Sequence, residues 1–368
     1  MTADPRVVLT LDAGGTTFVF SAVRGGEPVG EAVTLPSRAE DLETCLDALE
    51  EGFRQVRALA GGRADAISFA FPGPADYRAG IIGDLGNLRA FRGGVALGPM
   101  LEERFGVPVF INNDGDLFAY GEALGGLLPE VNAALAAAGS PKRFRNLLGV
   151  TLGTGFGAGL VHDGRLYLGD NGAGAEIWLL RSKLHPGCFA EEGVSIRAVR
   201  RAYAEGAGIP SEQAPEPKVI AAVAAGEVPG HRDAAREAFR RLGEAVGDAL
   251  ANAVTLVDAL VVVGGGLAGA APLFLPALVA EMNGALRDLS GGEVARMEVR
   301  AFNLEDPRER ARFFAGEART IAVPRSSRTV AYDPLKRVGV GVSPLGTSRA
   351  VGLGAYRFAL AALDGKEV

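Results

Sequence analysis

The stretch that decides the fold is Arg6-Val7-Val8-Leu9-Thr10-Leu11-Asp12-Ala13-Gly14-Gly15-Thr16-Thr17, near the start of the chain. A largely apolar run ends at Asp12, and a glycine turn leads into a second apolar run over residues 18–23. Apolar runs of this length on either side of a glycine turn are typical of paired strands. The stretch therefore predicts strand, turn and strand, with an acidic side chain where the first strand ends.

A second stretch of the same design opens the other half of the chain. An apolar run over residues 147–152 is followed by Gly153-Thr154-Gly155-Phe156-Gly157-Ala158-Gly159, and a further run continues to a turn at Asp163-Gly164. Two copies of strand, glycine turn and strand are typical of a diverged internal repeat. We therefore expect each copy to open one half of the protein.

Strand and helix patterns alternate around these two stretches. Helical spacing of apolar residues covers 42–60, 114 to about 124, and 234–257, and short buried strands are expected over 66–71, 107–111 and 259–263. This alternation predicts an α/β fold with parallel strands. Residues 133–145 and the Arg-rich stretch 305–328 are each expected to be an inserted, exposed helix or loop.

Composition excludes several classes of protein. The chain has 368 residues, of which 48% are hydrophobic and 22% charged, which suits two globular domains sharing a cleft. The net charge is -6 and the sequence has no run of Lys or Arg, so it lacks the basic patch expected of a nucleic-acid-binding surface. The uncharged stretch 259–280 contains Gly264-Gly265-Gly266, Pro272 and Pro276, so we expect a strand, a turn and a buried helix rather than a membrane span.

Cysteine usage and the N-terminus indicate a cellular compartment. Cys45 and Cys188 do not make a disulfide framework, and no apolar stretch suited to a signal peptide precedes the first glycines. We therefore expect a reduced, cytoplasmic protein that contacts neither nucleic acid nor membrane.

Three glycine-rich turns follow predicted strands, at residues 12–17, 153–157 and 264–266. Glycine lets backbone N–H groups approach an anion closely, and threonine hydroxyls add donors. Each turn alone is better explained as a simple tight turn, but three together favour phosphate binding. Neither a Walker A pattern nor a well-placed G-x-G-x-x-G is present, which argues against P-loop and Rossmann folds.

The order of these motifs resembles the ROK family of bacterial sugar kinases and sugar-responsive repressors. The resemblance rests on Asp12-Ala13-Gly14-Gly15-Thr16-Thr17, Pro72-Gly73-Pro74, Asn113-Asp114, the Gly153 turn and Gly264-Gly265-Gly266, in the family's order. It implies a two-domain actin-like ATPase (ribonuclease H-like) fold with an interdomain cleft. The smaller domain is expected to comprise residues 1–117 plus 347–368, and the larger one residues 118–346.

The resemblance also implies roles for individual residues. It implies ATP and Mg²⁺ as cofactors, with Asp12 facing the ion indirectly and these residues around the nucleotide: Asp12, Gly14, Gly15, Thr16, Thr17, Gly153, Thr154, Gly155, Gly264, Gly265 and Gly266. It assigns the sugar to these positions: Gly73, Asn87, Asn113, Asp114, Glu176 and Glu191. A homodimer is implied by family habit alone.

Physical chemistry supports Asp114 as the catalytic base independently of the family. Phosphoryl transfer needs a group that accepts the hydroxyl proton, and an Asp at a strand end in a cleft can do so. An Asp before a helix is equally well explained as an N-cap. A calcium loop is excluded, because its required glycine would fall on Leu117.

The chain departs from the family at a structural zinc site. Many members hold zinc with the His of an E-x-G-H motif and three cysteines, but Leu179 stands where that His belongs and Cys188 is the one cysteine left there. His185 and Cys188 do not complete a tetrahedral site, so we expect no bound zinc. The family His also touches the sugar, so Leu179 and Trp178 are expected to make the pocket more apolar on one side.

Three functions remain to be weighed. The first is a kinase that transfers the γ-phosphate of MgATP to a sugar hydroxyl, by resemblance the 6-hydroxyl of a hexose. The second is a repressor, for which the eleven residues before Asp12 leave no room for a helix-turn-helix domain. The third is a pseudokinase that binds sugar or nucleotide without turnover. Asp12, Asn113 and Asp114 favour the kinase, whereas Leu179 argues faintly for the pseudokinase; a fold relative with a non-sugar acceptor remains open.

Overall fold

The computed structural model describes residues 4–14, 16–86 and 90–366, and the chain divides into two compact units. The first unit comprises Met1–Gly125, Arg165–Gly174 and Thr347–Val368. The second comprises Gly126–Gly164 and Ala175–Gly346. The predicted domain division near residue 117 stays a prediction.

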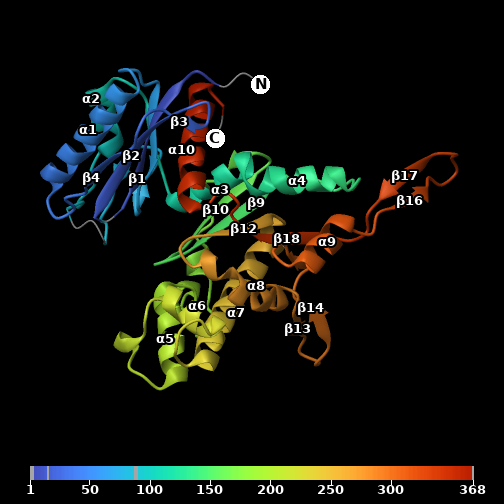
Figure 1. The fold of residues 1–368 in the computed structure, drawn as a ribbon. Helices are drawn as coiled ribbons and strands as arrows, with labels where there is room; N and C mark the ends of the chain where they lie inside the picture. The colour runs from blue at the N-terminus through green and yellow to red at the C-terminus, as the bar shows by residue number, and fades with distance from the viewer. Residues whose placement is uncertain (1–3, 15, 87–89, 367–368) are drawn as a thin grey trace. The chain divides into compact units, whose positions relative to one another are not determined.

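The first unit is built on a mixed sheet in the order β3-β2-β1-β5-β8, with β4 paired to β2 (Figure 1). Its strands are β1 (Val7–Ala13), β2 (Thr17–Arg24), β3 (Glu27–Pro28), β4 (Val33–Pro36), β5 (Ala66–Ala70) and β8 (Val109–Asn112). β1 and β2 form the expected antiparallel pair, whereas β1, β5 and β8 run parallel. A small hairpin, β6 (Ala75–Asp76) with β7 (Ile81–Ile82), follows β5.

Alternation along β1 determines which helices cover the sheet of the first unit. Its helices are α1 (Leu42–Leu59), α2 (Leu97–Phe105), α3 (Asp114–Gly125) and α10 (Thr347–Leu363). Leu9 belongs to a core cluster with Phe53 of α1, whereas its neighbour Val8 packs with Tyr356 of α10. Successive side chains of a strand point to opposite faces, so one apolar run supplies both cores.

Glycine brings α3 and α10 into close contact. A Cβ on Gly121 would lie 1.9 Å from the carbonyl oxygen of Ala350, and one on Gly354 would lie 1.9 Å from that of Leu117. No side chain fits at either position without moving a backbone. The return of the chain through α10 therefore depends on these two glycines.

The second unit is built on strands in the order β10-β9-β12-β18-β15 (Figure 1). They are β9 (Leu147–Leu152), β10 (Phe156–His162), β12 (Leu260–Gly264), β15 (Arg300–Asn303) and β18 (Arg337–Val342). The two-residue strand β11 (Arg165–Leu166) belongs to the Arg165–Gly174 segment of the first unit. β12 runs parallel to both β9 and β18, and β15 is parallel to β18. β10 is antiparallel to β9, as the internal repeat predicts.

Helices bury the central strand of the second unit. They are α4 (Leu127–Ala137), α5 (Ile196–Ala207), α6 (Pro217–Ala225), α7 (Arg232–Val257), α8 (Ala271–Met282) and α9 (Pro307–Ala315). All five residues of β12 are buried, which explains its unbroken apolar run. Gly243 lets α7 and α8 approach closely, since a Cβ at this position would lie 2.3 Å from the carbonyl oxygen of Phe274.

The predicted strands and helices are confirmed within one to two residues at most ends. The stretch 133–145 contains the end of α4 and is mostly exposed, as expected, although Leu135 is buried. Phe144 is also buried, held by two hydrogen bonds between its backbone and the side chain of Asn132. In the stretch 305–328, α9 buries Phe313, and the residues beyond it are exposed as expected.

The stretch 259–280 contains β12, a glycine turn and most of α8, as expected. No helix among the described residues has both the length and the apolar character that a membrane crossing requires.

A buried ion pair holds the base of the exposed segment that follows α9. Arg337 is fully buried, and its guanidinium donates to Asp333 at 2.6 Å. Asp333 also accepts from the backbone N–H groups of Glu317 and Leu335, each at 3.1 Å. Burial raises the pKa of Asp333, but the hydrogen bonds from Arg337 and the backbone outweigh it and leave the pKa below its ordinary value. One carboxylate thus joins both ends of the segment.

Replacing Asp333 with Ala should lower the free energy of unfolding by about 3–5 kcal/mol, because it leaves the buried charge of Arg337 unpaired. Urea unfolding measures this change. The double variant Asp333→Leu with Arg337→Met should lose less, since neither charge remains, and Glu298→Gln, at an exposed ion pair with Lys336, should change little. Equal losses for Asp333→Ala and Glu298→Gln would contradict the account.

Candidate functional site

The carboxyl ends of β1, β5 and β8 bring the predicted acidic residues of the first unit to one edge of its sheet. Asp12 is exposed near the end of β1, and Asp114 begins α3 directly after β8. Parallel strands end at the same edge, and open α/β sheets bind ligands there. Residues 102 positions apart therefore form one acidic edge.

Asp114 has the electrostatics expected of a proton acceptor. Solvent reaches the residue, yet the surrounding protein displaces much of the bulk water, and this burial raises the pKa of its carboxyl. The negative charge of Asp12 raises the pKa further, whereas the backbone N–H of Gly115 opposes the shift. A carboxylate destabilised in this way holds a proton more readily than an ordinary surface Asp.

The N-cap of α3 is Asn113, so the structural alternative for Asp114 is wrong. The carbonyl oxygen of Asn113 accepts from the N–H of Leu117 at 3.1 Å, and its side-chain oxygen accepts from Gly115 at 2.8 Å. Both bonds are typical of a capping residue. Asp114 accepts from Gly115 through one oxygen and lies in the first turn.

Tyr77 links two of the predicted sugar positions, and no sequence pattern pointed to it. Its hydroxyl donates to the carbonyl oxygen of Phe71 at 3.0 Å and accepts from Asn113 at 3.5 Å. A Cβ on Gly73 would lie 3.0 Å from the same hydroxyl. Gly73 therefore lets Tyr77 orient the Asn113 amide at the strand edge. Asn87 lies outside the described residues.

The first glycine turn is tight. The N–H of Gly14 donates to the carbonyl oxygen of Thr17 at 3.0 Å, and a Cβ on Gly14 would lie 2.8 Å from that oxygen. Thr16 is exposed, and its carbonyl oxygen accepts from Ser37 at 3.0 Å. Gly15 lies outside the described residues. An exposed threonine four positions after the exposed Asp12 suits an anion with a bound cation.

The two glycine turns of the second unit lie next to each other. Gly264 pairs with Thr151, so both turns leave the same edge of the sheet. Gly265 has φ +86°, and a Cβ there would lie 2.3 Å from the carbonyl oxygen of Leu152. That oxygen accepts from the N–H of Leu267 at 3.0 Å. The second turn is therefore locked against the strand that leads into the first.

Open space surrounds the remaining glycines of these turns. A Cβ on Gly153 or Gly266 would meet no atom within 4 Å, and Thr154 is exposed. Gly153 is fixed from behind, because its N–H donates to Gly155 at 3.0 Å and its carbonyl oxygen accepts from Ile196 at 2.9 Å. The edge thus offers room for a phosphate next to fixed backbone.

Glu191 lies at the first of these turns. One oxygen of its carboxylate accepts from the N–H of Phe156 at 3.0 Å and lies 2.9 Å from the Cβ position of Gly155. Arg197 approaches the other oxygen at 3.6 Å. Glu191 therefore ties the turn to α5, which Ser195 caps. Its predicted contact with sugar stays a prediction.

Glu176 precedes a short 3₁₀ helix (Ile177–Leu179), and its carboxylate accepts from the indole N–H of Trp178. Trp178 in turn packs edge-on against Phe189, with ring centroids 5.7 Å apart. Leu179 is 58% exposed. The position of the family His therefore presents an apolar surface beside the Glu176 carboxylate.

His185 and Cys188 are both exposed, in a turn closed by a hydrogen bond of 2.9 Å between their backbones. Among the described residues, no three His, Cys, Asp or Glu side chains are grouped to hold a metal ion.

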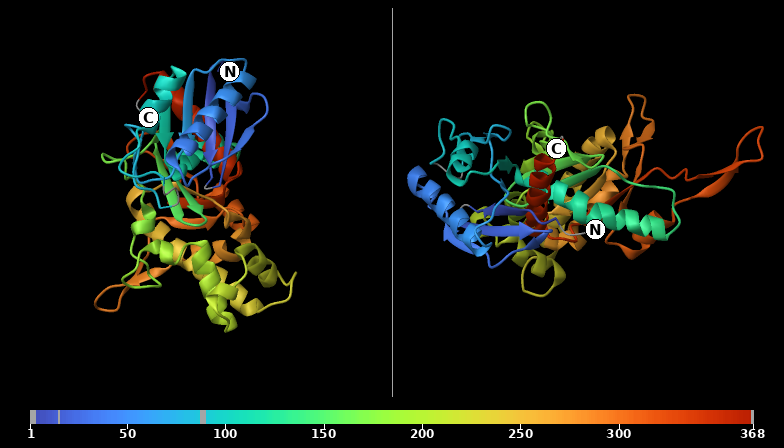
Figure 2. Two further views of the ribbon diagram at one scale, coloured as in Figure 1. Left: turned by 90° about the vertical axis from the view of Figure 1, so that its left-hand side faces the viewer. Right: turned by 90° about the horizontal axis from the view of Figure 1, so that it is seen from above.

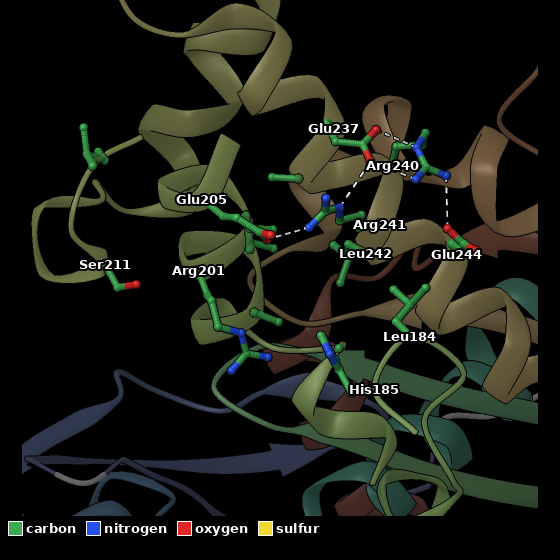
Figure 3. A pocket seen from close by; sticks show the side chains of 16 residues that line it. Leu184, His185, Arg201, Glu205, Ser211, Glu237, Arg240, Arg241, Leu242 and Glu244 are labelled. Atoms are coloured by element: carbon green, nitrogen blue, oxygen red, sulfur yellow. Dashed lines mark hydrogen bonds and ion pairs between the residues drawn. The ribbon is translucent and has the colours of Figure 1, made fainter. Parts of the chain in front are cut away.

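A hollow of about 500 Å³ between α5 and α7 is lined by none of the predicted site residues (Figure 3). Its arginines are neutralised by neighbouring acids. Arg241 contacts Glu205 at 2.7 Å and Glu237 at 3.2 Å, and Arg240 contacts Glu244 at 3.0 Å. These ion pairs join helices and leave the hollow without an excess charge to attract phosphate.

Gly265→Ala should lower the free energy of unfolding by about 2 kcal/mol or more, because the new Cβ meets the Leu152 backbone at an unfavourable φ. Gly266→Ala is the matched control, since its Cβ would meet open space. Chemical unfolding of both variants measures the difference. Equal stability of the two would contradict the locked turn.

Comparison with known proteins gives this arrangement a family context. A sequence profile described as "ROK family" matches residues 8–307. A glucokinase of Aeropyrum pernix is 34% identical over 174 residues, covering 46% of this chain and 48% of that protein. An N-acetyl-D-glucosamine kinase of Aliivibrio salmonicida is 30% identical over 168 residues, covering 45% and 50%. The chain spans about half the length of the curated relatives it matches.

Solved structures extend the similarity over the whole chain. The crystal structure of a glucokinase from Parabacteroides distasonis has a TM-score of 0.89 and 55% sequence identity, covering 98% of this chain and 99% of that one. A ROK family glucokinase from Streptomyces griseus, solved with glucose and AMPPNP, has a TM-score of 0.59 and 21% identity, covering 95% and 98%. The second similarity concerns the fold alone.

Proposed function

The chain belongs to the ROK family and has its actin-like ATPase fold, and on this premise we propose that it is an ATP-dependent sugar kinase. In this proposal the γ-phosphate of MgATP passes to a hydroxyl, by family resemblance the 6-hydroxyl, of a hexose or hexose derivative. The observation that carries the proposal is the acidic edge of the first unit, where Asp114 has a raised pKa beside Asp12. A glucokinase of 55% identity supports glucose as the first acceptor to try, and the N-acetyl-D-glucosamine kinases support an N-acyl sugar.

The residues of the two units fit a magnesium nucleotide. Asp12 is an exposed carboxylate, which suits a hydrated Mg²⁺ held indirectly. The open space at Gly153 and Gly266 leaves their turns accessible to phosphate and adenosine. Bound MgATP supplies the phosphoryl group that is transferred.

Asp114 then acts as general base on the acceptor hydroxyl. Its carboxylate takes the proton as the hydroxyl oxygen bonds to the γ-phosphorus and the bond from that phosphorus to the β-phosphate oxygen breaks. Asn113 orients the sugar, and Tyr77 orients Asn113. Glu191 holds the Gly155 turn in place during transfer.

The cellular compartment and the oligomeric state are proposed from the same family resemblance. A cytoplasmic location and a homodimer remain proposals, as does the division into a smaller domain (residues 1–117 plus 347–368) and a larger one (residues 118–346).

Asp114→Asn should lower turnover by a factor of about 10²–10⁴ while leaving nucleotide affinity nearly unchanged, because the amide cannot accept the proton. ADP release from MgATP is measured against hexoses, amino sugars and N-acetyl sugars. Asp47→Asn, at an exposed acid of α1, is the control and should retain full turnover. If Asp114→Asn kept full activity, Asp114 would not be the catalytic base. If the wild type bound ATP but released no ADP with any sugar, a pseudokinase or a non-sugar acceptor would be favoured.

The raised pKa of Asp114 predicts the pH dependence of turnover. The base acts when ionised, so kcat should fall as the pH drops through a pKa above the ordinary 3.8 of an Asp. Stability depends on pH in the opposite direction from kcat. The folded protein holds this proton more tightly than the unfolded chain, so ionisation of Asp114 lowers stability as the pH rises. Asp114→Asn should therefore melt no lower than the wild type at pH 7. A marked loss of melting temperature, or a kcat without an acid limb above 3.8, would contradict this.

A further inference from the structure

The hollow between α5 and α7 belongs wholly to the second unit, and the proposed reaction does not use it. It lies among the helices on one side of that unit's sheet, coloured yellow-green to yellow (Figures 1 and 2). Its volume of about 500 Å³ falls within the range of about 300–1,000 Å³ usual for small-molecule sites. The exposed hairpins contribute no residue to its lining: β13 (Ala285–Arg287) with β14 (Glu293–Ala295), and β16 (Arg319–Ala322) with β17 (Thr329–Tyr332).

The floor of the hollow is apolar and built from short side chains. Val199 of α5 and Ala238 and Leu242 of α7 line it, and all three are buried. Gly193 lines it from the turn before α5, and a Cβ there would lie 2.9 Å from the Cβ of Ala245 on α7. An apolar group of a ligand that enters the hollow therefore leaves water for an apolar surface.

The rim of the hollow is charged but balanced. It carries three arginines and three glutamates: Arg201, Arg240, Arg241, Glu205, Glu237 and Glu244. A ligand of high net charge gains little from such a rim, whereas a ligand with one charge of each sign finds a partner for both. The hollow therefore suits a zwitterion with an apolar body.

One positive and one negative side chain of the rim lie a helical turn apart on α5. Residues four apart on a helix have their Cβ atoms about 5–6 Å from each other, and Arg201 and Glu205 have this spacing in sequence. They are not paired with each other, because Glu205 contacts Arg241 of α7 at 2.7 Å and Arg201 turns away from that pair (Figure 3). A carboxylate and an ammonium group on one carbon of a ligand can contact both.

Arg201 is the arginine of this rim whose acidic partner lies outside the hollow. Its guanidinium donates to the carboxylate of Glu192 at 3.0 Å and to the carbonyl oxygen of the same residue. This contact with Arg201 is the main reason that the pKa of Glu192 lies below its ordinary value. A carboxylate that enters the hollow competes with Glu192 for the same guanidinium.

Glu192 in turn is linked to the glycine turn at residues 153–157. Its neighbour Glu191 accepts from the N–H of Phe156 at 3.0 Å. Arg197 lies between the two acids, 3.1 Å from Glu192 and 3.6 Å from Glu191. The short 3₁₀ helix Ala190–Glu192 is thus held by Arg201 on the side of the hollow, and it holds the glycine turn on the other side.

We propose that the hollow is a regulatory site for a free amino acid with an apolar side chain. The side chain packs on Val199 and Leu242, the carboxylate binds Arg201 and the ammonium group binds Glu205. Binding draws Arg201 from Glu192, which loosens the hold of Glu191 on the glycine turn and lowers its affinity for nucleotide. The link passes through side chains, so α5 and α7 keep their positions. The effect on nucleotide rests on the proposed function, whereas the binding of the amino acid does not.

Titration calorimetry with leucine and with phenylalanine, in the absence of nucleotide, tests the site itself. Each should bind with a dissociation constant of about 1 mM or below. Three probes should bind at least about tenfold more weakly than leucine: glycine lacks the apolar side chain, 4-methylpentanoate the ammonium group and 3-methylbutylamine the carboxylate. Absence of binding for both amino acids at about 10 mM, or equal binding of leucine and the two analogues with one charge, would overturn the proposal.

Substitutions on α5 locate the site. Ala202→Phe fills the hollow and should abolish leucine binding without changing the affinity for Mg·AMPPNP, since Arg201 and Glu192 are untouched. Arg200→Gln is the matched control and should bind leucine like the wild type, because Arg200 donates to the carbonyl oxygen of Ala214 outside the hollow. Circular dichroism checks folding, and Ala202→Leu is the smaller substitution if Ala202→Phe does not fold. Leucine binding that survives both Ala202 substitutions would place the amino acid elsewhere.

The affinity for Mg·AMPPNP with and without saturating leucine tests the regulatory link. Leucine should lower it about fivefold or more, and the nucleotide should lower the affinity for leucine by the same factor. Glu192→Gln removes the charged partner of Arg201, so this variant should bind leucine more tightly and nucleotide less tightly. An unchanged nucleotide affinity in saturating leucine would overturn the link. A wild type that binds leucine but no Mg·AMPPNP would contradict the proposed kinase and support the amino-acid site alone.

Discussion

The parallel pairing of β5 with β1 and β8, and of β12 with β9 and β18, is the constraint on which the rest of the structure depends. Parallel strands must all end at one edge, and connections between them must cross the sheet. Asp12 and Asp114 meet at that edge in the first unit, and the turns at Gly153 and Gly264 meet there in the second. Distant motifs become neighbours because the strands before them are paired.

Close backbone contacts made possible by glycine fix these edges in position. Gly265 lies where a Cβ would strike the Leu152 carbonyl, and Gly121 and Gly354 let α3 and α10 touch. α3 carries Asp114 at its first residue, so the packing of α10 on α3 supports the acidic edge from behind. Glycine thus has two separate roles in this chain, in strand-end turns such as that of Gly265 and in helix contacts such as those of Gly121 and Gly354.

The fold was largely predictable because the deciding strands are unbroken apolar runs that end at glycine or at an acid. The predicted strand, turn and strand at residues 6–23 and the helix that starts near Asp114 correspond to observed elements. Contacts between distant side chains were not predictable. Tyr77 reaches Asn113 across 36 positions, and Glu191 reaches the N–H of Phe156 across 35, without any local pattern to reveal them. The burial of Phe144 was likewise not predictable, because it lies in a stretch with no regular period and is held by the side chain of Asn132.

The central proposal is that the strand-end turns at residues 12–17, 153–156 and 264–266 bind the magnesium nucleotide, and hydrogen exchange with and without Mg·AMPPNP tests it most directly. Amides in peptides covering residues 12–17, 153–156 and 264–266 should exchange more slowly with the nucleotide, whereas those of the hollow between α5 and α7 should not change. Magnesium alone is the control. Protection confined to the α5–α7 hollow, or no protection at any of the three turns under saturating nucleotide, would contradict the account.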